Sequence, residues 1–334
     1  MEESVMKKII ALGLVMSMAA SVLAGCSGSA GTQGTSGSDN SGKTYTVGIC
    51  QLVQHEALDA ATQGFKDALT EKLGDRVTFD EQNASGDSAT CATIANQFVS
   101  SNVDLIMANA TPPLQACAAA TSTIPVLGTS VTDYATALQI DDWSGKTGMN
   151  ISGTSDLAPL SEQAKLLNEL FPDAKTVGLI YCSGEPNSLY QVNVISKELE
   201  ALGYTCQEFS FADSNDIASV TTSAVSLVDV IYIPTDNAAA SATEVIDNIC
   251  LPAGIPIVAS EEGICAGCGV ATLSISYYDL GYQTGLMAYE VLENGADVST
   301  MDIEYAPNVT KKYVPSRCEA LNVTIPEGYE AIAE

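Results

Sequence analysis

The sequence predicts an α/β protein with two lobes of like design, each a parallel sheet covered by helices. Short β-branched and apolar runs alternate with longer segments of helical spacing, which is typical of parallel sheets. This alternation starts near residue 46 and starts again near residue 176. About 290 residues follow residue 43, and a chain of that length favours two lobes over one core.

The elements of the two halves follow from these runs in order. In the first half we expect strands at 46–50, 77–79, 105–108 and 124–127, with helices at 58–73, 88–101 and 114–120. In the second half we expect strands at 176–181, 205–209, 230–233 and 255–258, with helices at 188–202, 215–227 and 238–249. The repetition predicts two Rossmann-like lobes.

Two extended segments, 148–153 and 269–275, separate the repeats, and long helices at 156–170 and 277–292 follow them. We interpret these segments as hinge strands that join the lobes. The N-terminal lobe then comprises 44–149 and 271–298, and the C-terminal lobe comprises 150–270 with 299–334 as a final crossing and tail. Such an architecture predicts a ligand cleft that closes about the hinge.

The first 43 residues predict export and a tether. Lys7 and Lys8 precede an apolar run at 9–23, and small residues then lead to Cys26, so 1–25 has the order of a signal peptide. The stretch resembles a bacterial lipobox, which implies lipidation of Cys26 and attachment to the outside of the cell membrane. An ordinary signal peptide with an accidental cysteine is the alternative. Residues 26–43 contain no large apolar side chain and are typical of a flexible linker.

Composition excludes some functions. The net charge is −28 with only 13 lysines and arginines, so nucleic acid is a poor partner. Nine cysteines follow Cys26, and most lie in apolar patterns where they act as small hydrophobes. Cys265 and Cys268 are either a loop disulfide or two free thiols. With one histidine and one CxxC motif, we expect no metal and no cofactor.

The loops after the expected strands are unusually polar, and ligands bind at the carboxyl ends of strands in parallel α/β sheets. Hydroxyls at helix starts favour an anion, and carboxylates in the second half favour a cation, which together suit an amino acid. The candidate binding residues are Gln54, His55, Leu58, Ala110, Thr111, Thr129, Ser130, Thr132, Glu185, Asn187, Ser188, Asp236, Asn237 and Glu261.

Each role has a structural alternative. We expect Asp236 to bind the ligand ammonium, with Glu185 and Glu261 as second choices, and helix-dipole complementation is the alternative for Asp236. His55 would stack on a ring or bond the ligand, or else cap the next helix. The candidates for binding the ligand carboxylate are Thr111, Thr129, Ser130 and Thr132. Asn187 and Asn237 could bind either the carboxylate or the ammonium. The residues Thr111, Ser188 and Asn237 are also good helix N-caps. Candidates for an aromatic wall are Tyr181, Tyr190 and Trp143, and for Trp143 we prefer a packing role.

Eight segments together resemble the ABC-type substrate-binding lipoproteins for tryptophan, tyrosine and phenylalanine uptake. They are QLVQHEALDAATQGFKDAL, NASGD, ANATPPLQA, SVTDYATA, NISGTSD, GEPNS, YIPTDN and YYDLGYQTGLMAYEVL, in the same order from about residue 45 to 298. The resemblance implies a type I periplasmic-binding-protein fold, an aromatic amino acid as ligand, and delivery to a membrane permease with its ATPase. Glu56 and the run 184–186 depart from the usual pattern and flank the expected cleft.

Two other functions stay open at this point. A ligand-sensing lipoprotein for a membrane receptor would use the same closing lobes. An α/β enzyme is the second alternative, but the body contains no GxGxxG, Walker A or GxSxG motif. We therefore expect a monomeric, extracytoplasmic binding protein that is not an enzyme.

Overall fold

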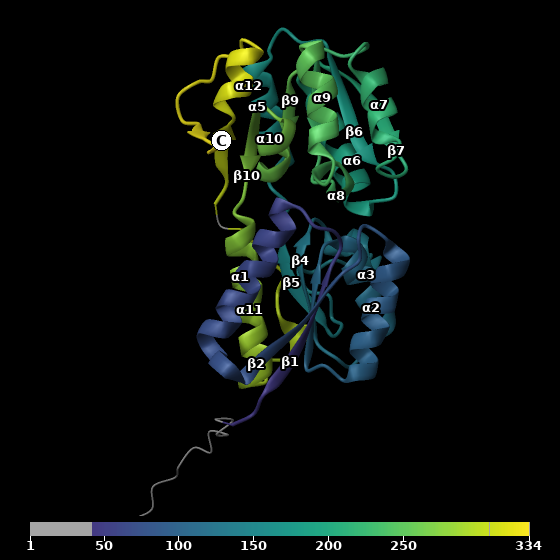
Figure 1. Ribbon diagram of the computed structural model, residues 1–334, viewed down its shortest axis with the longest axis vertical. Helices are drawn as coiled ribbons and strands as arrows, with labels where there is room; N and C mark the ends of the chain where they lie inside the picture. Colours follow the sequence, from purple (N-terminus) through teal and green to yellow (C-terminus); the bar gives the residue numbers. More distant parts are fainter. Residues whose placement is uncertain (1–41, 307, 334) are drawn as a thin grey trace, which may run out of the picture. The chain divides into compact units, whose positions relative to one another are not determined.

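The computed structural model describes residues 42–306 and 308–333 and contains two sheets with helices on both faces (Figure 1). The predicted signal peptide, Cys26 and most of the linker lie outside these residues. No helix in the described ranges is long and apolar enough to cross a lipid bilayer. The prediction of an α/β protein with two parallel-sheet lobes is confirmed.

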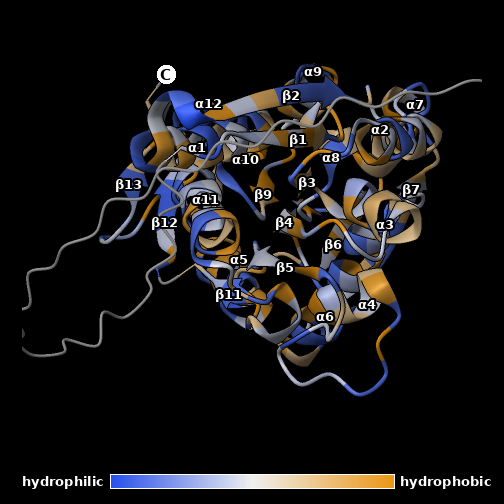
Figure 2. Cartoon of the chain, turned by 90° about the horizontal axis from the view of Figure 1, so that it is seen from below, coloured by the Kyte–Doolittle hydropathy of each residue, from blue (hydrophilic) through white to orange (hydrophobic). Residues whose placement is uncertain are grey.

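The first lobe is built on a six-stranded parallel sheet. Its order is β11 (Glu304–Tyr305), β5 (Ile151–Ser155), β4 (Val126–Val131), β3 (Leu105–Asn109), β1 (Tyr45–Gln51) and β2 (Val77–Asn83). Its helices are α1 (Glu56–Leu73), α2 (Ser88–Ser101), α3 (Thr111–Ala120), α4 (Tyr134–Leu138) and α11 (Tyr277–Asn294), with short 3-10 turns at Gly74–Arg76 and Val298–Thr300. One face of β1 packs with α1 and α11, and the other packs with α2 and α3. Figure 2 shows the edge strand β2 as largely hydrophilic and the central strand β3 as hydrophobic, as their sequences require.

The second lobe is built on a seven-stranded sheet that is parallel except for the pairing of β10 with β12. Its order is β13 (Glu330–Ala331), β12 (Thr310–Tyr313), β10 (Ala271–Ser274), β9 (Ile257–Ala259), β8 (Val230–Ile233), β6 (Thr176–Cys182) and β7 (Thr205–Phe211). Its helices are α5 (Leu160–Leu170), α6 (Pro186–Ala201), α7 (Ile217–Ala224), α8 (Asn237–Ala240), α9 (Thr243–Ala253), α10 (Glu262–Cys268) and α12 (Pro315–Ala320). Cys265 and Cys268 carry buried free thiols on α10.

The chain passes between the sheets three times: after β5, after β10, and between β11 and β12. Sheet membership therefore assigns β5 and β11 to the first lobe and β10 to the second. The predicted boundaries at 149/150, 270/271 and 298/299 are each a few residues too early, because β5, β10 and β11 pair with the sheet that precedes the crossing. The helix expected at 156–170 begins only at Leu160, because Pro159 supplies its N-cap and Asp156 lies in the crossing. The helix expected at 238–249 is two helices, α8 and α9.

Helix α11 is fixed to the first lobe by close contact with α1. Glycines make this contact possible: a Cβ on Gly281 would overlap the carbonyl oxygen of Ala61, and one on Gly64 would overlap that of Tyr278. Backbone oxygens cannot rotate away as a side-chain tip can. The start of α11, which follows the second crossing, is thereby held against α1, which begins beside the expected cleft.

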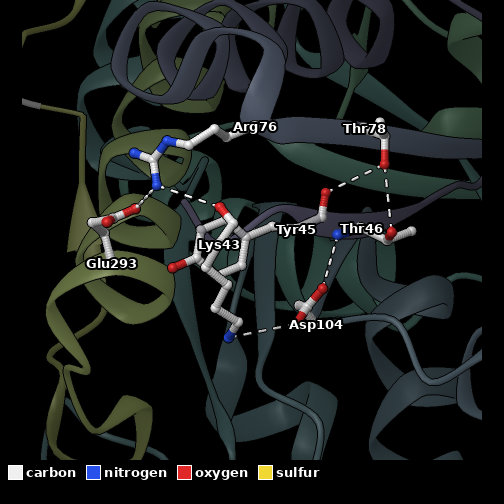
Figure 3. Close-up of polar contacts among 7 residues, drawn as sticks. All are labelled: Lys43, Tyr45, Thr46, Arg76, Thr78, Asp104 and Glu293. Atoms are coloured by element: carbon white, nitrogen blue, oxygen red, sulfur yellow. Dashed lines mark hydrogen bonds and ion pairs between the residues drawn. The ribbon is translucent and has the colours of Figure 1, made fainter. Parts of the chain in front are cut away.

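The described chain enters the first lobe at the amino edge of its sheet (Figure 3). Arg76 Nη1 lies 2.8 Å from Glu293 Oε2 of α11 and 3.4 Å from the Lys43 carbonyl oxygen. Asp104 Oδ2 accepts from the Thr46 backbone N–H at 2.8 Å. These contacts fasten the start of β1 at the edge opposite to the strand ends where ligands bind.

We predict that Gly281→Ala lowers the free energy of unfolding by about 2 kcal/mol, because overpacking against a fixed backbone oxygen typically costs 1–3 kcal/mol. Urea unfolding of the purified body measures this loss. Gly184→Ala is the control, since a Cβ there meets no other atom closer than 3.7 Å. Equal stability of the two variants would contradict the proposed close contact.

Candidate functional site

A small cavity of about 10 Å³ lies where the carboxyl ends of strands from both sheets meet. Its lining side chains come from α1, α6, α8, α10 and α11, from the ends of β4 and β8, and from the crossing after β5. The cavity is narrow, with room for little more than a water molecule between facing side chains. A ligand as large as an amino acid therefore enters only when the lobes move apart.

Eight of the predicted binding residues line this cavity: His55, Leu58, Ser130, Thr132, Asn187, Asp236, Asn237 and Glu261. The structure adds six that the sequence analysis did not name: Ala57, Asp156, Thr235, Ala240, Ile264 and Tyr277. No lysine or arginine is among these lining residues. The walls therefore carry carboxylates without a compensating side-chain cation.

The other six predicted residues lie around the cavity. Gln54 faces a separate surface hollow, and Glu185 lines a groove on the other side of α8. Ser188 is fully buried at the start of α6. The remaining three, Ala110, Thr111 and Thr129, are buried at the ends of β3 and β4, and Ala110 has a φ of 98°, a strained value for alanine.

The aromatic wall expected from Tyr181 and Tyr190 is not found at the cavity, whereas the packing role preferred for Trp143 is confirmed. None of the three lines the cavity. The Tyr181 hydroxyl donates to Glu208 Oε2 at 2.6 Å, and Trp143 packs against the core of the first lobe. Tyr277, the first residue of α11, is the aromatic residue that reaches the cavity, since the second crossing delivers it there.

Two of the lining carboxylates cap helices. Asp236 accepts from the backbone N–H groups of Cys182 at 2.6 Å and Ala239 at 2.8 Å. Glu261 accepts from Gly263 at 2.7 Å and Ile264 at 2.5 Å, at the start of α10. Glu185 serves α8 in the same way, through Asn237 and Ala238. Their oxygens therefore already have backbone donors, which is the structural alternative noted above for Asp236.

Asp156 differs from the other two carboxylates. Its Oδ2 accepts from the Tyr277 hydroxyl at 2.9 Å, but its Oδ1 is buried without a hydrogen-bond partner. Ser130 Oγ and Asn187 Oδ1 in the same cavity, and Thr111 Oγ1 at the nearby start of α3, are also buried without partners. Buried polar atoms are rarely left unpaired, so this cluster indicates groups made to meet a ligand.

Burial sets the protonation of the cavity. It raises the pKa of Asp156 to about 6 and that of Glu261 to about 7. Burial and the nearby negative charge of Glu185 both raise the pKa of Asp236, to about 7. Burial also lowers the pKa of His55, against the effect of its bond to Asn237. Groups facing the cavity are thus driven toward their neutral forms, and a bound cation would reverse this for the acids.

Two hydrogen bonds join the lobes across the cavity. His55 Nε2 lies 3.2 Å from Asn237 Oδ1, and Gln191 Nε2 donates to Thr132 Oγ1 at 3.2 Å. His55 is the N-cap residue of α1, but its side chain makes no capping bond. The capping alternative for His55 is therefore not what the structure contains.

The fold and the cavity define a two-lobed protein that encloses a small polar ligand. The chain belongs to the ABC transporter substrate binding protein family, whose model matches residues 46–334. It is 38% identical over 306 residues to a tyrosine-binding protein of Clostridioides difficile, covering 89% of this chain and 88% of that protein. The prediction of a substrate-binding protein of an ABC transporter is thereby confirmed.

Two solved structures bear on the arrangement of the lobes. A domain from Streptococcus pneumonia in complex with L-Trp is 32% identical, with a TM-score of 0.83, over 87% of this chain and 100% of that one. The ligand-free, open structure of a Clostridium difficile substrate binding protein with adhesive properties is 35% identical, with a TM-score of 0.66, over 86% and 99%. At similar identity, this chain fits the tryptophan complex better than the open form, which agrees with its narrow cavity.

We predict that the ligand-free protein becomes less stable as the pH rises from 4 to 8. In the folded state Asp156 and Glu261 hold protons that their unfolded forms, with pKa values of about 4, release. The stabilisation is complete below pH 4 and is lost as the pH rises through 6 and 7, by up to about 3 kcal/mol for Asp156. His55, with a lowered pKa, acts in the opposite direction.

Thermal unfolding across this pH range measures the effect. Asp156→Asn removes one of the titrating groups, so the melting temperature of that variant should change less with pH than that of the parent. An unchanged pH dependence would show that Asp156 is not buried in the ligand-free protein in solution.

Proposed function

We propose that this chain is an extracytoplasmic, lipid-anchored protein that captures an aromatic amino acid and delivers it to an ABC permease and its ATPase, and that it is not an enzyme. Membership of the family supports the transport role. The relatives whose ligands are known, one for tyrosine and one in complex with L-Trp, support the ligand class.

The observation that carries the ligand proposal is the free, buried Oδ1 of Asp156. Asp156 is 4% exposed, and a carboxylate in such a place is costly unless a cation pairs with it. The ligand ammonium would supply both the charge and a hydrogen-bond donor. We therefore assign the ammonium to Asp156, and we give Asp236 and Glu261 the role of holding α8 and α10 in place.

The unpaired hydroxyls of the cavity are suited to bind the carboxylate of the same ligand. Ser130 Oγ and Thr111 Oγ1 are buried donors at the carboxyl edge of the first sheet, beside the starts of α3 and α4. A carboxylate there would gain these hydroxyls and the nearby helix dipoles. With an ammonium at Asp156, the pairing is complementary to a zwitterion.

We predict that Asp156→Asn weakens binding of the preferred amino acid about 100-fold, because removing one member of a buried charge pair costs several kcal/mol. The asparagine retains an oxygen for the Tyr277 hydroxyl and replaces the free oxygen by an amide that repels the ammonium. Isothermal titration with tyrosine, tryptophan and phenylalanine measures the loss.

Asp133→Asn is the matched control. Asp133 is the N-cap of α4 at the same edge, its Oδ1 accepts from the Thr136 N–H at 2.7 Å, and asparagine caps equally well. This variant should bind as the parent does. Full affinity in Asp156→Asn, or equal binding of 3-(4-hydroxyphenyl)propionate, which lacks the ammonium, would refute the assignment.

The anchor is a separate part of the proposal and is supported by the sequence at 7–26. We predict that Cys26→Ala, expressed in a bacterium that processes lipoproteins, leaves the protein in the soluble extracytoplasmic fraction with its ligand affinity unchanged. Fractionation and immunoblotting measure the shift. A variant still held in the membrane would refute lipidation at Cys26.

A further inference from the structure

The cavity has a polar side and an apolar side. Its apolar lining residues are Ala57 and Leu58 of α1, Ala240 of α8 and Ile264 of α10. Ala57 and Leu58 follow His55 by two and three residues, and Ala240 follows Asn237 by three residues. The hydrogen bond between His55 and Asn237 therefore lies next to the apolar side of the cavity.

Sheet order separates this side from the proposed ammonium site. Asp156 follows β5 and His55 follows β1, and β4 and β3 lie between these strands. Neighbouring strands are about 4.8 Å apart, so the two chain segments leave the sheet about 14 Å from each other. The side chains of Asp156 and His55 with one aromatic amino acid between them fit that span, with the ring over the apolar side.

A chain of hydrogen bonds sets the tautomer of His55. Asn237 Nδ2 donates to Glu185 Oε2 at 2.6 Å, which turns Asn237 Oδ1 toward His55 Nε2 at 3.2 Å. An amide oxygen only accepts, so Nε2 carries the proton. Burial lowers the pKa of His55 and favours the neutral ring. Nδ1 is then an acceptor, and among the described residues no hydrogen-bond donor is paired with it.

We propose that His55 Nδ1 accepts a hydrogen bond from a donor on the ligand ring, so that the site selects aromatic amino acids with a ring O–H or N–H over phenylalanine. The inference rests on the proposed function and adds a specificity-determining residue to it. A site built to bond a ring donor rejects the analogue without it, because the acceptor then loses its hydrogen-bond partner in the closed protein. Glu185 and Asn237 act as positioning residues that fix the acceptor.

The test compares tyrosine, tryptophan and phenylalanine in the parent and in two variants of His55. The parent should bind tyrosine or tryptophan at least about 10-fold more tightly than phenylalanine. His55→Leu, which removes the acceptor and keeps an apolar side chain, should abolish this preference. Loss of the bond to Asn237 weakens all three ligands by a common factor, so the ratio of tyrosine or tryptophan affinity to phenylalanine affinity is the quantity that reports on the acceptor. His55→Gln, which restores an acceptor, should recover part of the preference.

Gln191→Leu separates specificity from lobe closure. It removes the other hydrogen bond between the lobes, to Thr132, so it should weaken all three ligands by the same factor. If His55→Leu also weakens all three equally, His55 only holds the lobes together and the inference is overturned. A parent without preference for a ring donor overturns it even if the variants fail to fold.

The same data test this inference separately from the proposed function on which it rests. Binding of none of the three amino acids would refute the proposed function, and the specificity role with it. Binding of all three at equal affinity would refute only the specificity role. Circular dichroism and melting temperatures of each variant establish that the measured proteins are folded.

Discussion

The cavity depends on one electrostatic constraint, the burial of carboxylates where no side-chain cation is present among its lining residues. Two of them, Asp236 and Glu261, accept from backbone N–H groups, so each of their oxygens has a hydrogen-bond donor within the protein. Asp156 has the Tyr277 hydroxyl on one oxygen and nothing on the other. The closed lobes thus leave one uncompensated position, and the desolvation penalty at Asp156 disfavours closure around anything that lacks a cation.

The fold could be predicted because it follows from local patterns. Apolar periodicity distinguishes strands from helices, and the repeat of the pattern indicates two lobes. The positions of the lobe boundaries were predicted less accurately. The strands β5 and β10 are short extended runs whose sequence does not specify the sheet they join, and tertiary packing decides it. The break between α8 and α9 falls at Ser241 and Ala242, where the backbone of Ala242 leaves the helical conformation within a continuous helical sequence pattern.

The site was predicted only in part, because local sequence patterns locate loops at strand ends but do not show which side chains the tertiary fold brings together. Loops at strand ends could be found, and eight of the cavity residues were among those named. Asp156 was missed because the apolar spacing of 157–167 extends the helical pattern back over it, whereas Pro159 delays the helix to Leu160. A carboxylate directly after β5 was the available signal, since strand ends had already been identified as the ligand edge. Tyr277 was assigned to a helix correctly, but the path of the second crossing decides that it reaches the cavity.

The fastening of β1 at the amino edge of the first sheet has a mechanical consequence. Load applied through the residues before Tyr45 acts along the axis of β1, which is hydrogen-bonded to β2 on one side and β3 on the other. Those ladders resist in shear, and the Arg76–Glu293 and Asp104–Thr46 contacts spread the load to α11 and to the start of β3. None of this force path passes through the three crossings, so a pull on the chain before Tyr45 would leave the opening and closing of the second lobe unstrained.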